Sequence, residues 1–127
     1  MAEMRTPMRK IRGLGATGEG TGHFWRIRVT SVALIILTLY FLGLVISLNG
    51  ADYQTVHAAL AQPFAAIMMA LFVVIGLIHM RLGMQEIIED YIHEEGQKLA
   101  LLILSIFFCV AVGAASIFAL IKLTLGG

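Results

Sequence analysis

The chain has 127 residues, of which 59% are hydrophobic and 13% are charged, with a formal net charge of +1 and a mean hydropathy of +0.89. Soluble domains carry about 25% charged residues, so this composition excludes an ordinary soluble domain and indicates an integral membrane protein. The length fits a single domain over residues 1–127. The single cysteine, Cys109, excludes an internal disulfide, and its apolar surroundings in the sequence favour a small buried hydrophobic residue.

The first segment, residues 1–23, is polar and rich in glycine. A basic cluster comes first and spaced glycines follow it: Arg5, Arg9, Lys10, Arg12, Gly13, Gly15, Gly18, Gly20 and Gly22. The glycines separate the charges from any apolar stretch, and no small-residue cleavage site follows directly, which argues against a signal peptide. We predict a retained, flexible N-terminal arm of low order.

Three apolar stretches follow, each long enough to cross a bilayer as a helix. Residues 29–48 contain no charge and can span a hydrocarbon core of about 30 Å. Residues 49–52 break this span, and Pro63 suits the start of the next one, which covers residues 64–88. The third span covers residues 99–125, and its length predicts a tilt. The predicted fold class is therefore an all-α membrane protein with three transmembrane helices.

The distribution of Lys and Arg predicts the orientation of these helices. Basic residues gather before or at the start of the first span, where Arg26 and Arg28 add to the cluster of the arm. The connection at residues 49–62 has no Lys or Arg, the charged connection at residues 89–98 has Lys98, and the C-terminal end has Lys122. Because basic residues favour the cytoplasmic side, we predict a cytoplasmic N-terminus and a C-terminus on the opposite side.

One histidine, His79, lies inside the second apolar stretch, and Asp90 and Tyr91 follow near its polar end. An ionisable residue at membrane depth is a functional-site hypothesis by default. At about 100° per residue, one helical face collects two glycines, the imidazole and two carboxylates: Gly76, His79, Gly83, Glu86 and Asp90. The glycines would let a neighbouring helix or a flat macrocycle approach this face closely.

Each of these residues also has a simpler interpretation. A membrane histidine can hydrogen-bond to another helix with no cofactor. Tyr91 is typical of the interfacial aromatic belt, and Asp90 is typical of a helix end. However, uncharged imidazole is a common axial ligand of haem iron, and because His79 is the one histidine at depth, a second imidazole would have to come from another polypeptide. Arg28 or His23 could then reach a haem propionate at the water boundary.

Two segments resemble the hydrophobic membrane anchor of succinate dehydrogenase, respiratory complex II. The segment from Gly22-His23 to Arg28-Val29-Thr30-Ser31 is similar to that family's Gly-His…Arg-x-Thr-Ala opening. The segment 78–93 is similar to its His-x-x-x-Gly-Met-x-x-x-x-x-Asp-Tyr pattern. Three spans, a basic arm and the length agree with the smaller, D-type anchor. Ser31 stands where Ala is common, and Arg81 stands where many members have an apolar or aromatic residue.

The resemblance implies a function, a cofactor and partners. His79 corresponds to one axial ligand of the iron of haem b, whose other ligand comes from a partner anchor, cytochrome b556. Tyr91 corresponds to the tyrosine that hydrogen-bonds a ubiquinone carbonyl, and Asp90 corresponds to its acidic neighbour. Arg28 and His23 match residues near the haem propionates. The chain would anchor the flavoprotein and iron–sulfur subunits to the bacterial inner membrane, as a subunit outside the catalytic core.

Other functions stay open on the sequence. A fumarate reductase anchor would serve the reverse reaction with a quinol, and a small polytopic transporter or a purely structural anchor would need no haem. A transporter would place a lone carboxylate in mid-helix, whereas the carboxylates here cluster at one end of the second span. The sequence has no dinucleotide fingerprint and no cysteine set, so flavin and iron–sulfur sites are not expected in this chain.

Overall fold

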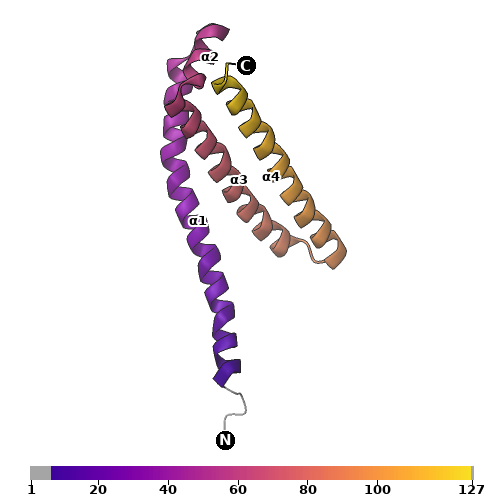
Figure 1. The fold of residues 1–127 in the computed structure, drawn as a ribbon. Helices are drawn as coiled ribbons and strands as arrows, with labels where there is room; N and C mark the ends of the chain where they lie inside the picture. The colour runs from indigo at the N-terminus through magenta and orange to yellow at the C-terminus, as the bar shows by residue number, and fades with distance from the viewer. Residues whose placement is uncertain (1–6, 127) are drawn as a thin grey trace, which may run out of the picture.

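The computed structural model describes residues 7–126, with side chains from Thr21 onward. This part of the chain contains no strand and forms four helices: α1 (Pro7–Ser47), α2 (Tyr53–Ala61), α3 (Pro63–Tyr91) and α4 (Glu95–Thr124) (Figure 1). Three stretches are long and apolar enough to cross a membrane, namely Thr21–Ser47, Pro63–Tyr91 and Glu95–Thr124. The prediction of an all-α protein with three transmembrane spans is confirmed.

The helices extend beyond the predicted spans. Helices α3 and α4 continue into the charged connection and leave only residues 92–94 between them. Residues 1–6 of the predicted flexible arm lie outside the described residues, and from Pro7 the backbone of this arm is helical. Each glycine there costs about 1 kcal/mol relative to alanine. Extending an existing helix needs no new nucleation, however, and the long apolar span supplies that helix.

Helix α2 occupies the connection between α1 and α3 and is not predicted by the sequence. Gly50, with φ +78°, turns the chain after α1. Asp52 then caps α2, because its side chain accepts a hydrogen bond from the Thr55 amide at 3.0 Å. Hydrogen bonds from the Thr55 hydroxyl and amide hold the pKa of the Asp52 carboxyl below its usual value. Pro63 occupies the first turn of α3, as predicted.

Helix α3 is the central element of the bundle. It packs against α1 on one side and α4 on the other, whereas α1 and α4 do not approach each other within residues 7–126 (Figure 1). Against α1, the rings of Phe41 and Phe72 stack with centroids 5.1 Å apart. Against α4, a Cβ atom added at Gly113 would lie 3.1 Å from Leu77 Cδ1, so the glycine permits the close approach of the two helices.

Few side chains are buried in this arrangement. The buried set is apolar and lies along the contacts of α3 with its neighbours: Leu37, Ala65, Ala66, Leu82, Ile88 and Cys109. Cys109 is therefore buried, as the sequence predicts. Large apolar side chains remain exposed along all three spans, among them Ile46, Phe107 and Phe118. In a membrane protein such faces contact lipid or other transmembrane helices.

Candidate functional site

The face of α3 that carries the predicted stripe packs against α1. The polar contacts of His79 and Glu86 with α1 form a polar seam between the two helices. His79 Nδ1 lies 2.9 Å from Thr30 Oγ1. One heptad further along α3, Glu86 Oε1 lies 2.9 Å from His23 Nε2. In the other direction, a Cβ atom at Gly76 would lie 3.8 Å from a Leu34 side-chain methyl. The imidazole, one carboxylate and one glycine of the predicted stripe thus lie on one face of α3, and that face meets another helix of the same chain.

His79 is half-buried and is held at one ring nitrogen. Its hydrogen bond to Thr30 is the cross-helix bond that the sequence leaves open as the alternative without a cofactor. This bond engages Nδ1, and in the part of the chain that the structure describes no hydrogen bond reaches Nε2. One nitrogen of the ring is therefore fixed by the protein, and the other is available to a ligand.

A recess of about 390 Å³ lies beside His79. Its other walls come from one face of α1: Ser31, Leu34, Ile35, Thr38 and Leu39. Gly83, one turn along α3, has open space around the position of a Cβ atom. No cluster of three or more His, Cys, Asp or Glu side chains among the described residues could hold a metal ion. A metal at His79 would therefore take its remaining ligands from a macrocycle or from another chain.

Arg28 and His23, the residues predicted near the propionates, point to other partners. The Arg28 guanidinium carbon lies 4.6 Å from the centroid of the Phe24 ring, a cation–π contact. His23 pairs with Glu86, a member of the predicted stripe, and the two side chains are 28% and 50% exposed. The structure brings His23 to the same seam as His79 and does not bring Arg28 to it.

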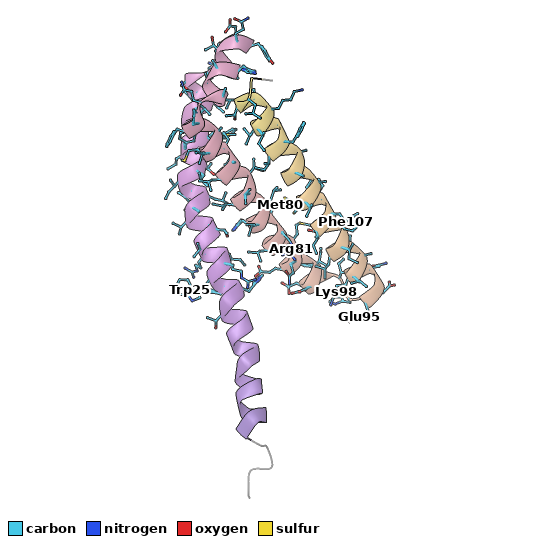
Figure 2. The ribbon with its side chains drawn as sticks, viewed as in Figure 1. Trp25, Met80, Arg81, Glu95, Lys98 and Phe107 are labelled. Atoms are coloured by element: carbon cyan, nitrogen blue, oxygen red, sulfur yellow. The ribbon has the colours of Figure 1, made fainter. Side chains whose placement is uncertain are left out.

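The polar end of the bundle is marked by residues on two outer helices. Figure 2 shows Trp25 on α1 and Glu95 and Lys98 on α4 near the same end of the bundle. Tryptophan and charged residues gather where a membrane helix meets water. This end of the structure therefore matches one membrane interface.

Tyr91 and Asp90 lie at this end, in the last turn of α3. Both are exposed, and the Tyr91 side chain is 75% accessible. Tyr91 borders an apolar recess of about 470 Å³ between α3 and α4, whose walls include Met84, Leu101 and Phe108. A phenol group therefore stands beside an apolar recess at the water end of a membrane helix, which suits a ligand with a polar head and an apolar body.

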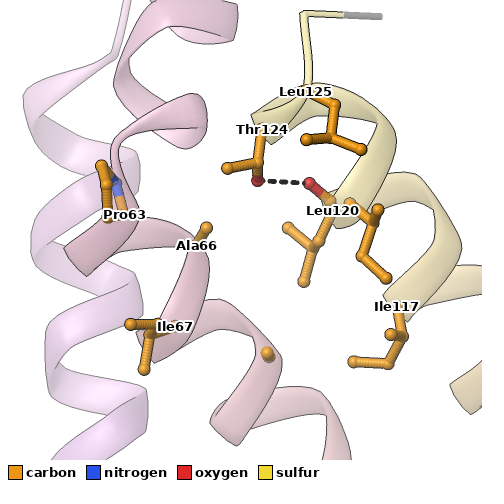
Figure 3. Close-up of a pocket in the computed structure, with 9 residues that line it drawn as sticks. Pro63, Ala66, Ile67, Ile117, Leu120, Thr124 and Leu125 are labelled. Atoms are coloured by element: carbon orange, nitrogen blue, oxygen red, sulfur yellow. Dashed lines mark hydrogen bonds between the residues drawn. The ribbon is translucent and has the colours of Figure 1, made fainter.

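A second apolar recess, of about 410 Å³, lies at the other end between the start of α3 and the end of α4 (Figure 3). Pro63, Ile67, Ile117 and Leu120 are among its walls. The Thr124 hydroxyl, its polar group, donates to the Leu120 carbonyl at 2.6 Å. No titratable side chain lines this recess, so it lacks the groups for proton transfer or metal binding.

Sequence reasoning missed the partners of both histidines. From the sequence, Thr30 is named only within the segment that resembles the family, and a contact between Glu86 and His23 is not predicted. A signal for both pairs is present, because Thr30 follows His23 by one heptad and Glu86 follows His79 by one heptad. Two antiparallel helices with equal heptad spacing place such residues opposite each other. Using this signal requires knowing that the first and second spans pack together.

Comparison with known proteins identifies the family of this chain. Residues 2–113 match the model of the family described as succinate dehydrogenase/fumarate reductase transmembrane subunit. The chain is 38% identical over 121 residues to the succinate dehydrogenase hydrophobic membrane anchor subunit of Paracoccus denitrificans, covering 95% of this chain and 93% of the relative. It is 29% identical to the subunit of the same name in Rickettsia conorii, covering 87% and 89% of the two chains. The chain therefore belongs to the family of succinate dehydrogenase/fumarate reductase transmembrane subunits.

Proposed function

We propose that this chain, as a membrane anchor of succinate dehydrogenase, binds haem b through His79 and forms part of the ubiquinone-reduction site with Tyr91 and Asp90. It acts in electron transport as a subunit outside the catalytic core, in the inner membrane of a bacterium. The relatives reported above carry the name of a succinate dehydrogenase anchor, which favours succinate oxidation over the fumarate reductase alternative.

The half-buried imidazole of His79 is the observation that carries the proposal. It lies inside a membrane span, its Nδ1 is held by Thr30, its Nε2 has no partner among the described residues, and a recess adjoins it. Metal-bound histidines characteristically have the other ring nitrogen hydrogen-bonded in this way. The residues present therefore fit an axial ligand of haem, and bound haem would supply a one-electron carrier held between two anchor subunits.

The second axial ligand is assigned to a partner anchor of the cytochrome b556 type. His57 lies on the short helix α2, His93 lies in the connection after α3, and His23 is paired with Glu86 at the polar end. None of these three histidines lies next to His79 in the packing of α1 against α3. The exposed apolar faces of the spans offer the partner anchor a surface on which to pack.

Tyr91 and Asp90 are proposed to act on the head of the quinone. The Tyr91 hydroxyl would donate a hydrogen bond to a quinone carbonyl oxygen and polarise it, which favours the reduced form. Reduction to the quinol consumes two electrons and two protons. Asp90, exposed beside Tyr91, can relay protons from water to this position.

The soluble flavoprotein and iron–sulfur subunits are proposed to dock at the end of the bundle that carries Tyr91. Acidic side chains concentrate there on the last turns of α3 and the start of α4: Glu86, Glu89, Glu94 and Glu95. In the described helices the carboxylates of the spans lie near helix ends, which fits a docking surface and disfavours the transporter alternative.

A reduced-minus-oxidised absorption spectrum of the purified membrane complex tests the proposal. We expect a b-type haem spectrum from the wild type and its loss or perturbation in His79→Ala. His57→Ala, in which the removed imidazole lies on α2 against the Tyr53 ring, is the matched control and should keep the wild-type spectrum. This chain expressed alone should bind haem poorly. A six-coordinate haem spectrum from the isolated chain, or an unchanged spectrum in His79→Ala, would contradict the proposal.

A further inference from the structure

The Thr30 hydroxyl has three neighbours and one hydrogen to share among them. Its Oγ1 lies 2.7 Å from the carbonyl oxygen of Arg26 and 3.1 Å from that of Ile27, both in the preceding turn of α1. It also lies 2.9 Å from His79 Nδ1 across the helix contact. A hydroxyl donates one hydrogen and accepts through its lone pairs. The direction of the bond to His79 therefore depends on where that hydrogen goes.

The hydrogen is best placed on the Arg26 carbonyl, because a carbonyl oxygen can only accept. If the hydroxyl donated to His79 instead, its oxygen would face two carbonyl oxygens with no hydrogen between them. Such a contact is repulsive, because lone pairs on both oxygens face each other. With the hydrogen on the Arg26 carbonyl, the Thr30 oxygen presents a lone pair to His79.

The state of the imidazole follows from this direction. Because Thr30 accepts the hydrogen bond, His79 Nδ1 must donate it and therefore carries a hydrogen. A neutral imidazole carries one ring hydrogen, so Nε2 is left with its lone pair. In the described part of the chain no hydrogen bond occupies Nε2, and the recess beside His79 is bordered by α1.

We propose that Thr30 is a positioning residue that fixes His79 as the Nδ1–H tautomer and so leaves the Nε2 lone pair available to bind a metal. The metal part of this inference rests on the proposed haem function, whereas the tautomer follows from the contacts of Thr30 alone. An acceptor on the far nitrogen also fixes the plane of the ring and raises its basicity as a ligand.

The tautomer can be measured without haem. Solid-state NMR of the full chain in lipid bilayers, with ¹⁵N-labelled histidine rings, distinguishes the two neutral tautomers, and His79→Ala assigns the signal. We expect the Nδ1–H form in the wild type and in Thr30→Ser, which keeps the hydroxyl. Thr30→Val has a similar shape and no hydroxyl, and it should show a mixture with the Nε2–H form. An Nε2–H form in the wild type, or an unchanged tautomer in Thr30→Val, would overturn the proposal.

A redox titration of the purified complex tests the consequence for the metal. Thr30→Val should raise the haem midpoint potential, because the imidazole becomes a weaker donor to ferric iron, and should weaken haem retention by about 10- to 100-fold. Thr30→Ser should restore the wild-type potential. An unaltered potential in Thr30→Val would overturn the role of Thr30.

Thr124→Val is the matched control for the titration. Thr124 donates to the carbonyl four residues earlier, as Thr30 does, but it lies at the C-terminal end of α4 (Figure 3). Its removal should leave the potential unchanged, and a change as large as that of Thr30→Val would overturn the specific role of Thr30. A wild-type complex that contains no haem would contradict the proposed function, and the NMR measurement would then decide the role of Thr30 by itself.

Discussion

His23 and Glu86 join α1 to α3 across 63 positions of sequence, with His23 Nε2 at 2.9 Å from Glu86 Oε1. The two side chains are 28% and 50% exposed, so water weakens their attraction. We expect a double-mutant cycle of His23→Ala and Glu86→Gln to give a coupling free energy of about 0.2–1 kcal/mol. Unfolding of the full chain in detergent measures it. A coupling of several kcal/mol would contradict this prediction, because it would require a buried pair.

Gly113 allows α4 to lie close to α3. A Cβ atom there would lie 3.1 Å from Leu77 Cδ1, so Gly113→Leu would force the two helices apart. We expect a loss of about 1–3 kcal/mol in the free energy of unfolding. Gly43→Leu on α1 is the control, because nothing lies within 4 Å of its Cβ position, and this change should be tolerated in the isolated chain. Equal destabilisation by both substitutions would show that helix contact is not the cause.

Tyr91→Phe should slow quinone reduction while leaving assembly and haem content intact. The substitution keeps the ring and removes one hydroxyl, and losing a hydrogen bond of about 1.5–3 kcal/mol slows the reaction roughly 10- to 100-fold. Succinate-dependent ubiquinone reduction measures the effect, and an artificial acceptor at the flavoprotein should be reduced at the normal rate.

Tyr53→Phe is the control for this experiment. Tyr53 is 78% exposed, close to the 75% of Tyr91, but it lies on α2 at the other end of the bundle. It should reduce ubiquinone normally. A normal rate in Tyr91→Phe would restrict Tyr91 to an interfacial role, and a failure of Tyr91→Phe to assemble would make that role structural.

The ends of the chain should lie on opposite sides of the membrane, with the N-terminus in the cytoplasm. Three spans place the ends on opposite sides, and the basic residues before the first span predict which side holds each end. Reporter fusions at Ala2 and Gly127 should therefore give opposite signals. Equal signals would contradict three crossings, and opposite signals with an external N-terminus would contradict the predicted orientation.

The cap of α2 should weaken in acid. The folded state lowers the pKa of the Asp52 carboxyl below its usual value, because Thr55 hydrogen-bonds the carboxylate. The stabilisation is therefore present above that value and is lost as the pH falls through the lower pKa of the folded state. Hydrogen exchange at the Thr55 amide should be faster in Asp52→Ala than in the wild type at neutral pH, and this ratio should fall in acid, where the protonated carboxyl is a weaker acceptor. Asp52→Asn keeps a neutral acceptor at every pH, so the ratio of the exchange rates of Asp52→Ala and Asp52→Asn should not depend on pH.

The fold was largely predictable because the membrane limits the choices. An apolar stretch as long as residues 29–48 has to be a helix in lipid, where every backbone group needs an internal partner. Pro63 marked a helix start for a local steric reason. Helix α2 was not predicted, because its 9 residues are too few to give a clear periodic signal. The helical part of the N-terminal arm was not predicted either, because its glycines resemble a linker.

The residues of the candidate site could be predicted from the sequence, but the contacts between them could not. His79 stood out because an imidazole at membrane depth is rare. Its bond to Thr30 depends on the register between α1 and α3, which packing sets and no single helix encodes. Arg28 shows the same limit, because its contact with Phe24 four residues earlier is local, whereas the sequence suggested a ligand far from its own helix.

Several hydroxyl groups form hydrogen bonds within their own helix and do not depend on a neighbouring helix. Thr30, Ser31 and Thr124 each donate to a carbonyl in the preceding turn of their own helix. A newly made span can thus enter lipid with these groups satisfied and no neighbour present. Because α1 is synthesised before α3, the acceptor on Thr30 is in place when the second span arrives. Packing of α3 against α1 then selects one tautomer of the His79 ring during folding, before any cofactor binds.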